Sequence, residues 1–170
     1  MISDGNRNQK WANEYAELKE LLTPEEYESA RGSTLNAHYT SPTVIKAMYQ
    51  AIENMNVQPR NLLEPSMGIG NFFGLLPEKL SGAKLYGVEL DDLTGRIAKQ
   101  LYQNADITVD GFEHTTHPDD FFDLAVGNVP FGNYGVHDRR YDRQNLLIHD
   151  YFFAKTLDKM PSSLRLPVAL

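Results

Sequence analysis

The chain has 170 residues and a formal net charge of −7, and apolar residues make up 41% of it. This length and composition are typical of one ordinary globular domain with a packed core. The absence of cysteine excludes disulfides and thiolate metal sites. Because there is neither an 18-residue apolar run nor an apolar N-terminal segment, nothing indicates a membrane or export, and we expect a cytoplasmic location.

The first part of the chain carries signals for two helices. Apolar residues recur at helical spacing over residues 11–22. Thr23 is expected to cap a second helix, because Pro24 suits its first position and Glu26 completes a capping box. This helix should run to about Arg31, where a Gly-Ser pair follows. We treat residues 1–34 as an N-terminal helical extension.

Strands and helices then alternate along residues 35–170, which we expect to form one α/β domain. Ser41 should start a helix whose apolar face carries Val44, Ile45, Met48 and Ile52. The predicted elements that follow are a strand at 62–63, a helix at 70–80, strands at 84–89, 107–109 and 122–126 with a helix at 92–102 among them, a helix at 146–160, and the start of a fifth strand at 164–170. This alternation predicts a Rossmann-like, doubly wound, mostly parallel sheet with helices on both faces. Since the chain stops at the fifth strand, we expect an incomplete sheet whose exposed edge favours self-association.

A glycine-rich turn follows the first predicted strand, where sheets of this kind bind ligands. It reads Glu64-Pro65-Ser66-Met67-Gly68-Ile69-Gly70-Asn71-Phe72. Glycines let the backbone bend tightly and approach a ligand closely. A dinucleotide-binding fingerprint needs a third glycine where Phe73 stands. The carboxylate of Glu64 instead suits a ligand that carries an amino group and a sulfonium charge, and a plain strand-to-helix turn is the alternative.

Glu89 ends the second predicted strand, 19 residues after Gly70. A carboxylate at this distance can accept hydrogen bonds from both hydroxyls of a ribose. The alternative is a solvated acid that precedes a helix and interacts favourably with its dipole.

The turn after the fourth predicted strand is the most specific motif. It reads Gly127-Asn128-Val129-Pro130-Phe131-Gly132. The chain resembles the amino-methyltransferases, whose catalytic loop reads Asn/Asp-Pro-Pro-Tyr/Phe, and in particular the N6-adenine DNA methyltransferases of restriction-modification and mobile-element systems. Three blocks match in the family's order, at residues 39–42, 64–72 and 128–131. The resemblance implies the class I methyltransferase fold, S-adenosyl-L-methionine as cofactor, and methylation of the exocyclic amine of adenine in DNA.

The resemblance also implies a role for each residue. The Asn128 side chain and the carbonyl of Val129 would accept hydrogen bonds from the adenine amine, and Phe131 would stack on the flipped base. The family usually has proline in place of Val129, but Pro130 still biases that residue toward an extended backbone. The implied cofactor residues are Tyr39, Thr40, Pro42, Glu64, Pro65, Ser66, Gly68, Gly70, Asn71, Phe72, Glu89, Leu90, Asp110 and Phe112. The alternatives are a helix start at residues 39–42 and a turn with a core phenylalanine at residues 110–112.

The charge of −7 would repel a phosphate backbone at long range, so we expect other domains or a partner subunit to share in DNA binding. Arg139, Arg140 and Arg143 interleave with Tyr141 and could touch a DNA backbone. Two acids among them make a solvated mixed-charge loop an equal alternative. The histidines lack metal-ligand spacing, so no metal site is predicted.

Two other functions stay open at this point. The same catalytic loop serves methylation of a protein glutamine or of an RNA base. The acidic charge and the short sheet also fit a truncated, non-catalytic module that binds a cofactor or a partner.

Overall fold

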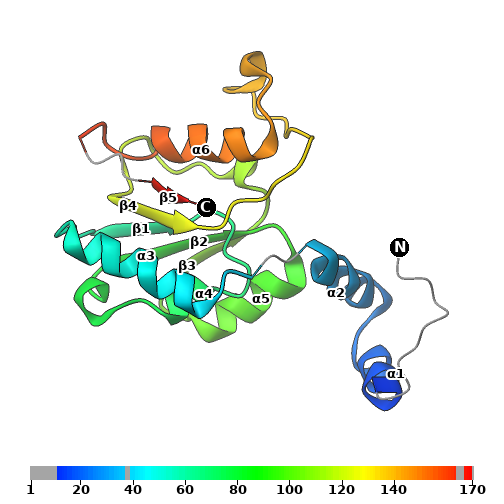
Figure 1. Ribbon diagram of the computed structural model, residues 1–170. Helices are drawn as coiled ribbons and strands as arrows, with labels where there is room; N and C mark the ends of the chain where they lie inside the picture. Colours follow the sequence, from blue (N-terminus) through cyan, green and yellow to red (C-terminus); the bar gives the residue numbers. More distant parts are fainter. Residues whose placement is uncertain (1–10, 37–38, 164–166, 170) are drawn as a thin grey trace. The chain divides into compact units, whose positions relative to one another are not determined.

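The computed structural model describes residues 11–36, 39–163 and 167–169 (Figure 1). The chain divides into two compact units, Met1–Ala37 and His38–Leu170. Within the described ranges, every helix is too short or too polar to cross a membrane.

The N-terminal unit is a pair of helices, α1 (Ala12–Leu21) and α2 (Pro24–Asn36). The predicted capping box is confirmed, since the Thr23 amide donates to Glu26 Oε2 at 3.0 Å and the Glu26 amide donates to Thr23 Oγ1 at 3.2 Å. The prediction that the helix ends near Arg31 was wrong, because α2 continues through Gly32 to its last residue at 36. A single glycine costs only about 1 kcal/mol inside a helix, which is not enough to end one.

The second unit is built on a sheet of five parallel strands in the order β3-β2-β1-β4-β5. These strands are β1 (Asn61–Glu64), β2 (Lys84–Glu89), β3 (Asp106–Val109), β4 (Leu124–Gly127) and β5 (Pro167–Ala169). The predicted doubly wound α/β fold is therefore confirmed. The order reverses beside β1, and ligands of such sheets bind outside the carboxyl ends of the strands at that point.

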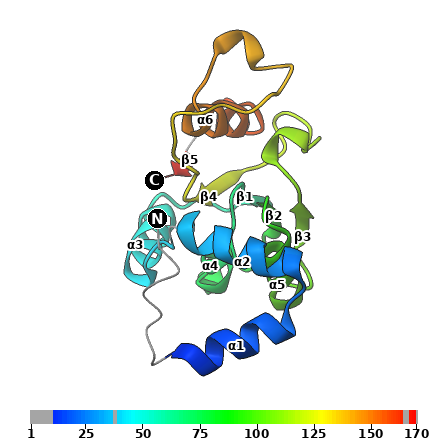
Figure 2. The same cartoon turned by 90° about the vertical axis from the view of Figure 1, so that its right-hand side faces the viewer.

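Helices cover both faces of the sheet (Figures 1 and 2). One face carries α3 (Pro42–Asn54), α4 (Asn71–Gly74) and α5 (Asp92–Leu101), and the other carries α6 (Ile148–Asp158). Successive strand residues alternate between the two cores, so that Leu62 packs with α3 and Leu63 packs with α6. Because both faces are covered, β1 and β4 read as short apolar runs.

Two details of the helices differ from the prediction. The helix expected over residues 70–80 is only the single turn of α4, followed by a 3-10 turn at Glu78–Leu80. Pro77 explains the break, because it lacks an amide hydrogen and disfavours a helical backbone at the residue before it. In α3, Val44 is 39% exposed, and Tyr49 takes a place on the buried face instead.

Candidate cofactor and target site

The glycine turn adopts a backbone that its two glycines make accessible. Gly68 and Gly70 have φ of 57° and 83°, in the left-handed region that side chains rarely adopt. A Cβ at Gly70 would also overlap the ring of Tyr102, whose hydroxyl donates to the Gly70 carbonyl at 2.7 Å. The Met67 amide donates to the Val88 carbonyl at 2.9 Å. The turn is thereby fixed against β2 and the end of α5.

The carboxyl of Glu64 lies buried at the end of β1, directly before the turn. The residue is 2% exposed, and Oε2 has no hydrogen-bond partner among the described residues. Burial raises the pKa of Glu64 well above its usual range, and repulsion from Glu89 raises it further. A buried carboxyl without a partner is costly, so this position would gain stability from a bound cation or hydrogen-bond donor.

Glu89 occupies the neighbouring carboxyl end of β2. Its Oε2 accepts from the Gly68 amide at 2.7 Å, and its Oε1 accepts from the Asp91 amide at 2.8 Å. Burial raises the pKa of Glu89 although these amide hydrogen bonds lower it. Each carboxylate oxygen keeps a second lone pair, so both can still accept from a ligand hydroxyl. The side chain of Leu90 is exposed beside it.

The block at residues 39–42 lies against the glycine turn. A Cβ built on Gly68 would be 4.0 Å from Cε1 of Tyr39, and the Tyr39 side chain is 60% exposed. Thr40 is half-buried, and Pro42 begins α3 after Ser41, whose hydroxyl accepts from the Val44 amide at 3.4 Å. The fold therefore brings the accessible ring of Tyr39 to the glycine turn, which begins 25 residues later in the sequence.

The two candidates after β3 occupy different surroundings. The Asp110 amide donates to the Glu89 carbonyl at 3.0 Å, which places this residue beside the same sheet edge. The hydrogen bond from His114 lowers the pKa of Asp110, followed by the one from the Gly111 amide. The ring of Phe112 is 3% exposed and packs on Tyr151 and Phe152. Its position matches the alternative of a core phenylalanine.

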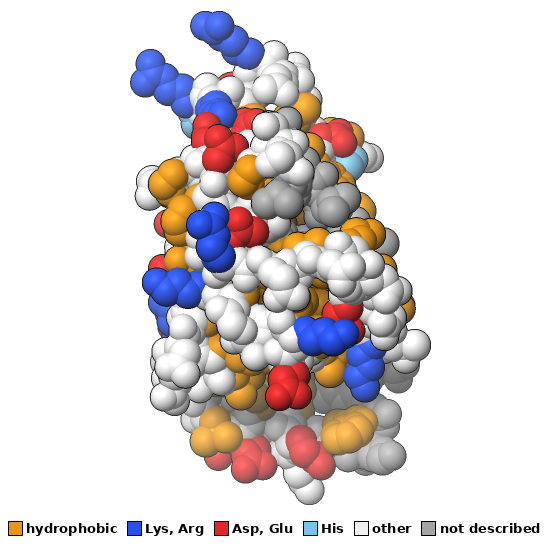
Figure 3. Space-filling view, turned by 90° about the vertical axis from the view of Figure 1, so that its left-hand side faces the viewer, with side chains coloured by type: hydrophobic (Ala, Val, Ile, Leu, Met, Phe, Trp, Pro, Cys, Tyr) orange, Lys and Arg blue, Asp and Glu red, His pale blue; other side chains and the backbone are white. Residues whose placement is uncertain are grey.

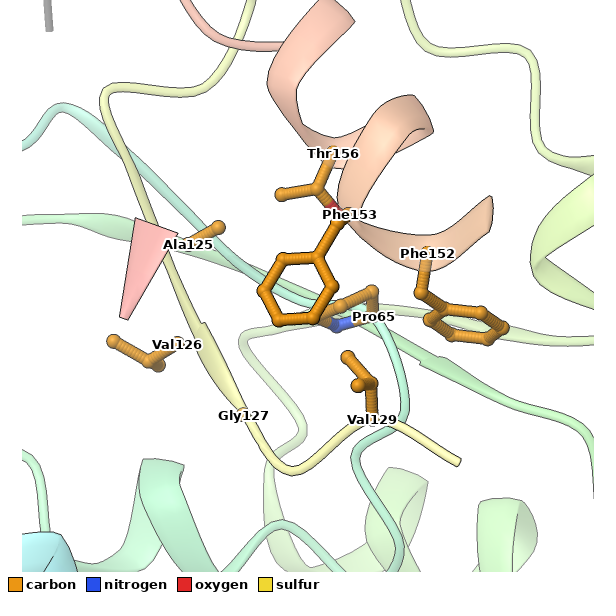
Figure 4. A pocket seen from close by; sticks show the side chains of 8 residues that line it. All are labelled: Pro65, Ala125, Val126, Gly127, Val129, Phe152, Phe153 and Thr156. Atoms are coloured by element: carbon orange, nitrogen blue, oxygen red, sulfur yellow. The ribbon is translucent and has the colours of Figure 1, made fainter. Parts of the chain in front are cut away.

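The loop after β4 adjoins the glycine turn. A Cβ on Gly127 would lie 3.5 Å from Pro65 Cδ and 3.7 Å from Glu64 Cγ. Pro65 and Val129 line one small apolar pocket together with residues of α6 (Figure 4). The side chain of Val129 is 3% exposed, so the residue that departs from the family pattern anchors the loop in the core.

Phe131 has the opposite environment, since 58% of it is exposed. Its ring lies 6.1 Å from the ring of His149 in α6, with an angle of 34° between their planes. Asn128 directly follows β4 and is half-buried. The loop can thus offer polar acceptors and an open aromatic face at one edge of the sheet.

Two residues of the site were not predicted from the sequence. The Tyr49 hydroxyl donates to the Phe72 carbonyl at 2.9 Å, and Tyr102 bonds the Gly70 carbonyl, so both hold the turn. Burial and the nearby Glu64 raise the pKa of both hydroxyls. Their only signal in the sequence was a tyrosine within or just after a helix. Among the described residues, no three His, Cys, Asp or Glu side chains are grouped so as to hold a metal ion.

Comparison with known proteins gives two relatives of interest, while no family model matches. The chain is 28% identical over 149 residues to the defense against restriction protein B of Escherichia phage P1, an alignment that covers 85% of the chain. It is 32% identical over 74 residues to the type II methyltransferase M.CvrRI of Paramecium bursaria Chlorella virus XZ-6E, which covers 44% of the chain. These alignments span 6% and 19% of the relatives' own lengths.

Solved structures agree on the fold. A protein of Listeria monocytogenes described as a class I S-adenosylmethionine-dependent methyltransferase superimposes with a TM-score of 0.58 at 17% identity, over 71% of this chain and 42% of that one. The PH0226 protein of Pyrococcus horikoshii gives a TM-score of 0.51 at 15% identity, over 69% of this chain and 52% of that one. Together with the strand order, these similarities show that the chain has the class I S-adenosylmethionine-dependent methyltransferase fold.

Proposed function

We propose that the chain binds S-adenosyl-L-methionine at the carboxyl ends of β1 and β2 and transfers its methyl group to the exocyclic amine of adenine in DNA. The observation that carries this proposal is the buried Glu64 carboxyl, whose Oε2 has no partner in the described part of the chain and which lies beside the loop of Asn128 and Phe131. The viral relative named as a type II methyltransferase supports the choice of DNA as substrate.

The residues at the sheet edge fit the cofactor. Glu64 would accept from its amino group, which supplies the missing partner for a buried carboxyl. Glu89 would accept from the ribose hydroxyls with its remaining lone pairs. Tyr39 would cover the methionine end, and Asp110 would accept from the adenine amine of the cofactor. The bound cofactor supplies a methyl group activated by the sulfonium charge.

The loop after β4 would prepare the acceptor. The side-chain oxygen of Asn128 and the carbonyl of Val129 accept from the two N–H groups of the adenine amine, which favours a localised lone pair on nitrogen. Phe131 stacks on the base after it leaves the duplex. A lone pair localised in this way would let the nitrogen accept the methyl group that the cofactor held by Glu64 and Glu89 would supply, and the proton that the nitrogen gives up would pass to solvent. Positioning supplies most of the rate enhancement, because the buried Val129 fixes the loop relative to Pro65.

Calorimetry tests the cofactor part of the proposal. The full chain should bind S-adenosylmethionine, and Glu89→Ala should weaken binding because it loses charge-assisted hydrogen bonds to the ribose. Glu78→Ala, a change at an exposed acid of the 3-10 turn, is the matched control and should bind normally. Equal affinities for the wild type and Glu89→Ala would remove this carboxylate from the site.

The acceptor is tested separately with labelled S-adenosylmethionine and a panel of duplex DNA, RNA and protein. We expect the label in DNA adenine. Label in a protein glutamine or in RNA would replace the proposed substrate while keeping the cofactor site.

We also propose that other domains or a partner contribute to DNA binding, and that two chains can pair along the β5 edge. A particle mass that stays that of one chain across a concentration series would contradict this pairing.

A further inference from the structure

The three arginines between Phe131 and α6 differ in what surrounds them. Arg140 donates to the two carboxylate oxygens of Asp119 at 2.9 and 2.8 Å, and its other terminal nitrogen lies 2.9 Å from Asp158. Arg139 and Arg143 are exposed, and within the described ranges their side chains form neither an ion pair nor a hydrogen bond. The sequence alone does not show which arginines form ion pairs within the protein. In the structure, Arg140 is the one that holds the loop.

The loop is anchored on α6 by buried polar contacts. The carboxylate of Asp138 accepts from the Tyr151 hydroxyl at 2.8 Å and from Lys155 Nζ at 3.1 Å, and the Lys155 side chain is only 4% exposed. Tyr141 is buried and donates to Asp158 at 2.8 Å. A buried ion pair satisfied in this way fixes one arrangement, since any other would leave a charge unpaired. The loop is therefore shaped before a partner binds.

Two acids at or beside the loop are paired with lysine or arginine side chains. Asp119 pairs with Arg140 and with Lys159 at 2.8 Å, and Asp138 pairs with Lys155. Asp142 lies 2.9 Å from His137 Nδ1. The guanidinium groups of Arg139 and Arg143 face solvent, and Asp142 is the one acid of residues 132–147 that has a histidine in place of a lysine or arginine as its ion-pair partner. Figure 3 shows Lys and Arg side chains projecting at the top of the view.

The contacts with α6 give the distance from these arginines to the candidate target loop. Phe131 packs on His149 near the start of the helix. The arginine segment bonds the helix at Tyr151 and Lys155 through Asp138, and at Asp158 through Tyr141. These contacts lie two to nine residues beyond His149, which is about 3–14 Å along the helix axis. Phosphates of one DNA strand follow each other every ~3.4 Å of duplex axis, so this span corresponds to about one to four nucleotides.

We propose that Arg139 and Arg143 bind backbone phosphates of the substrate DNA within about four nucleotides of the flipped adenine. This inference rests on the proposed function. It gives an acidic chain a local cationic contact with DNA, and the preformed loop lowers the entropic cost of making it. Phosphate contacts of this kind set position and carry no base specificity.

The test is anisotropy of a labelled duplex with a central adenine opposite an abasic site, titrated with the full chain across a salt series. Each lost phosphate contact should reduce the salt slope by about 0.9, which is about 8-fold in affinity at 0.1 M salt, so Arg139→Gln/Arg143→Gln should bind about 60-fold more weakly. Lys84→Gln/Lys99→Gln is the matched control, because it removes the same charge from exposed positions at the start of β2 and on α5. Shortening the duplex on one side to about one base pair from the adenine should weaken the wild type and leave the arginine variant unaffected.

Thermal melting accompanies the titration. The arginine variant should melt like the wild type, since its lost side chains have no partner among the described residues. If the wild type methylates DNA and both charge variants show the same affinity and slope, the phosphate assignment is wrong and the proposed function stands. If the wild type binds cofactor but neither binds nor methylates DNA, the phosphate assignment and the DNA substrate are both wrong, whereas the cofactor site stands.

Discussion

Replacing Glu64 by glutamine tests whether the buried carboxyl of this residue binds the cofactor. The carboxyl is 2% exposed, and Oε2 is without a partner in the described part of the chain. Its folded-state pKa is raised, first by burial and then by Glu89. The folded state therefore holds its proton more tightly than the unfolded state, and stability is lost as pH rises from the unfolded pKa of about 4.3 toward the folded one.

The magnitude follows from the cost of an unsatisfied buried group. That cost is about 1–3 kcal/mol, and more when the group is charged. Glu64→Gln removes the titration, so the variant should be more stable than the wild type at about pH 8 by a similar amount. At roughly 3 °C of Tm per kcal/mol for a chain of this size, the gain is about 3–9 °C. The two proteins should converge below about pH 4, where the carboxyl is protonated in both states.

The assay is thermal melting of both proteins from acid to alkaline pH, with and without S-adenosylmethionine. Cofactor should raise the Tm of the wild type, while Glu64→Gln should bind it about 10- to 150-fold more weakly through the loss of one charge-assisted hydrogen bond of about 1.5–3 kcal/mol. Glu78→Gln makes the same charge change at an exposed site and should alter neither property. A Glu64→Gln protein that is less stable at alkaline pH and binds cofactor normally would refute this reasoning.

Three further perturbations probe the fold around the site. Gly70→Ala forces a side chain into a left-handed backbone and against Tyr102, so urea unfolding should show a loss of about 1–3 kcal/mol. Burial lowers the pKa of His117, so the wild type should lose stability as pH falls below about 6.5, and melting of His117→Phe should not show this loss. Lys155→Met leaves the half-buried Asp138 carboxylate without its cation, and the free energy of unfolding should fall by about 1.5–3 kcal/mol. Adding Asp138→Leu should restore part of this loss, whereas two additive losses would show that the residues do not form a pair.

The fold could be predicted because its signals are local. Thr23 and Ser41 cap helices through side chains three residues from the amides that they bind. Short apolar runs separated by helical segments require a parallel sheet, and the predicted strands differ from the observed ones by only a few residues. The length of α4 was missed because one proline outweighed a helical pattern.

The details of the site depend on contacts that the sequence does not display. The hydrogen bond from the Gly68 amide to the Glu89 carboxylate forms only because Gly68 adopts a left-handed backbone. Phe112 turned toward the core because α6, far along the chain, supplies its aromatic partners. The separation of Arg140 from its two neighbours likewise depends on Asp119, which lies 21 residues away.

Mass spectrometry of nucleosides tests the central proposal most directly. Duplex DNA would be incubated with the full chain and S-adenosylmethionine that carries a deuterated methyl group, and then digested. We predict N6-methyladenine with the deuterated methyl, and its loss in Asn128→Ala with cofactor binding retained. Labelled cytosine, or unlabelled DNA from a chain that binds the cofactor, would contradict the assignment of this fold to adenine methylation.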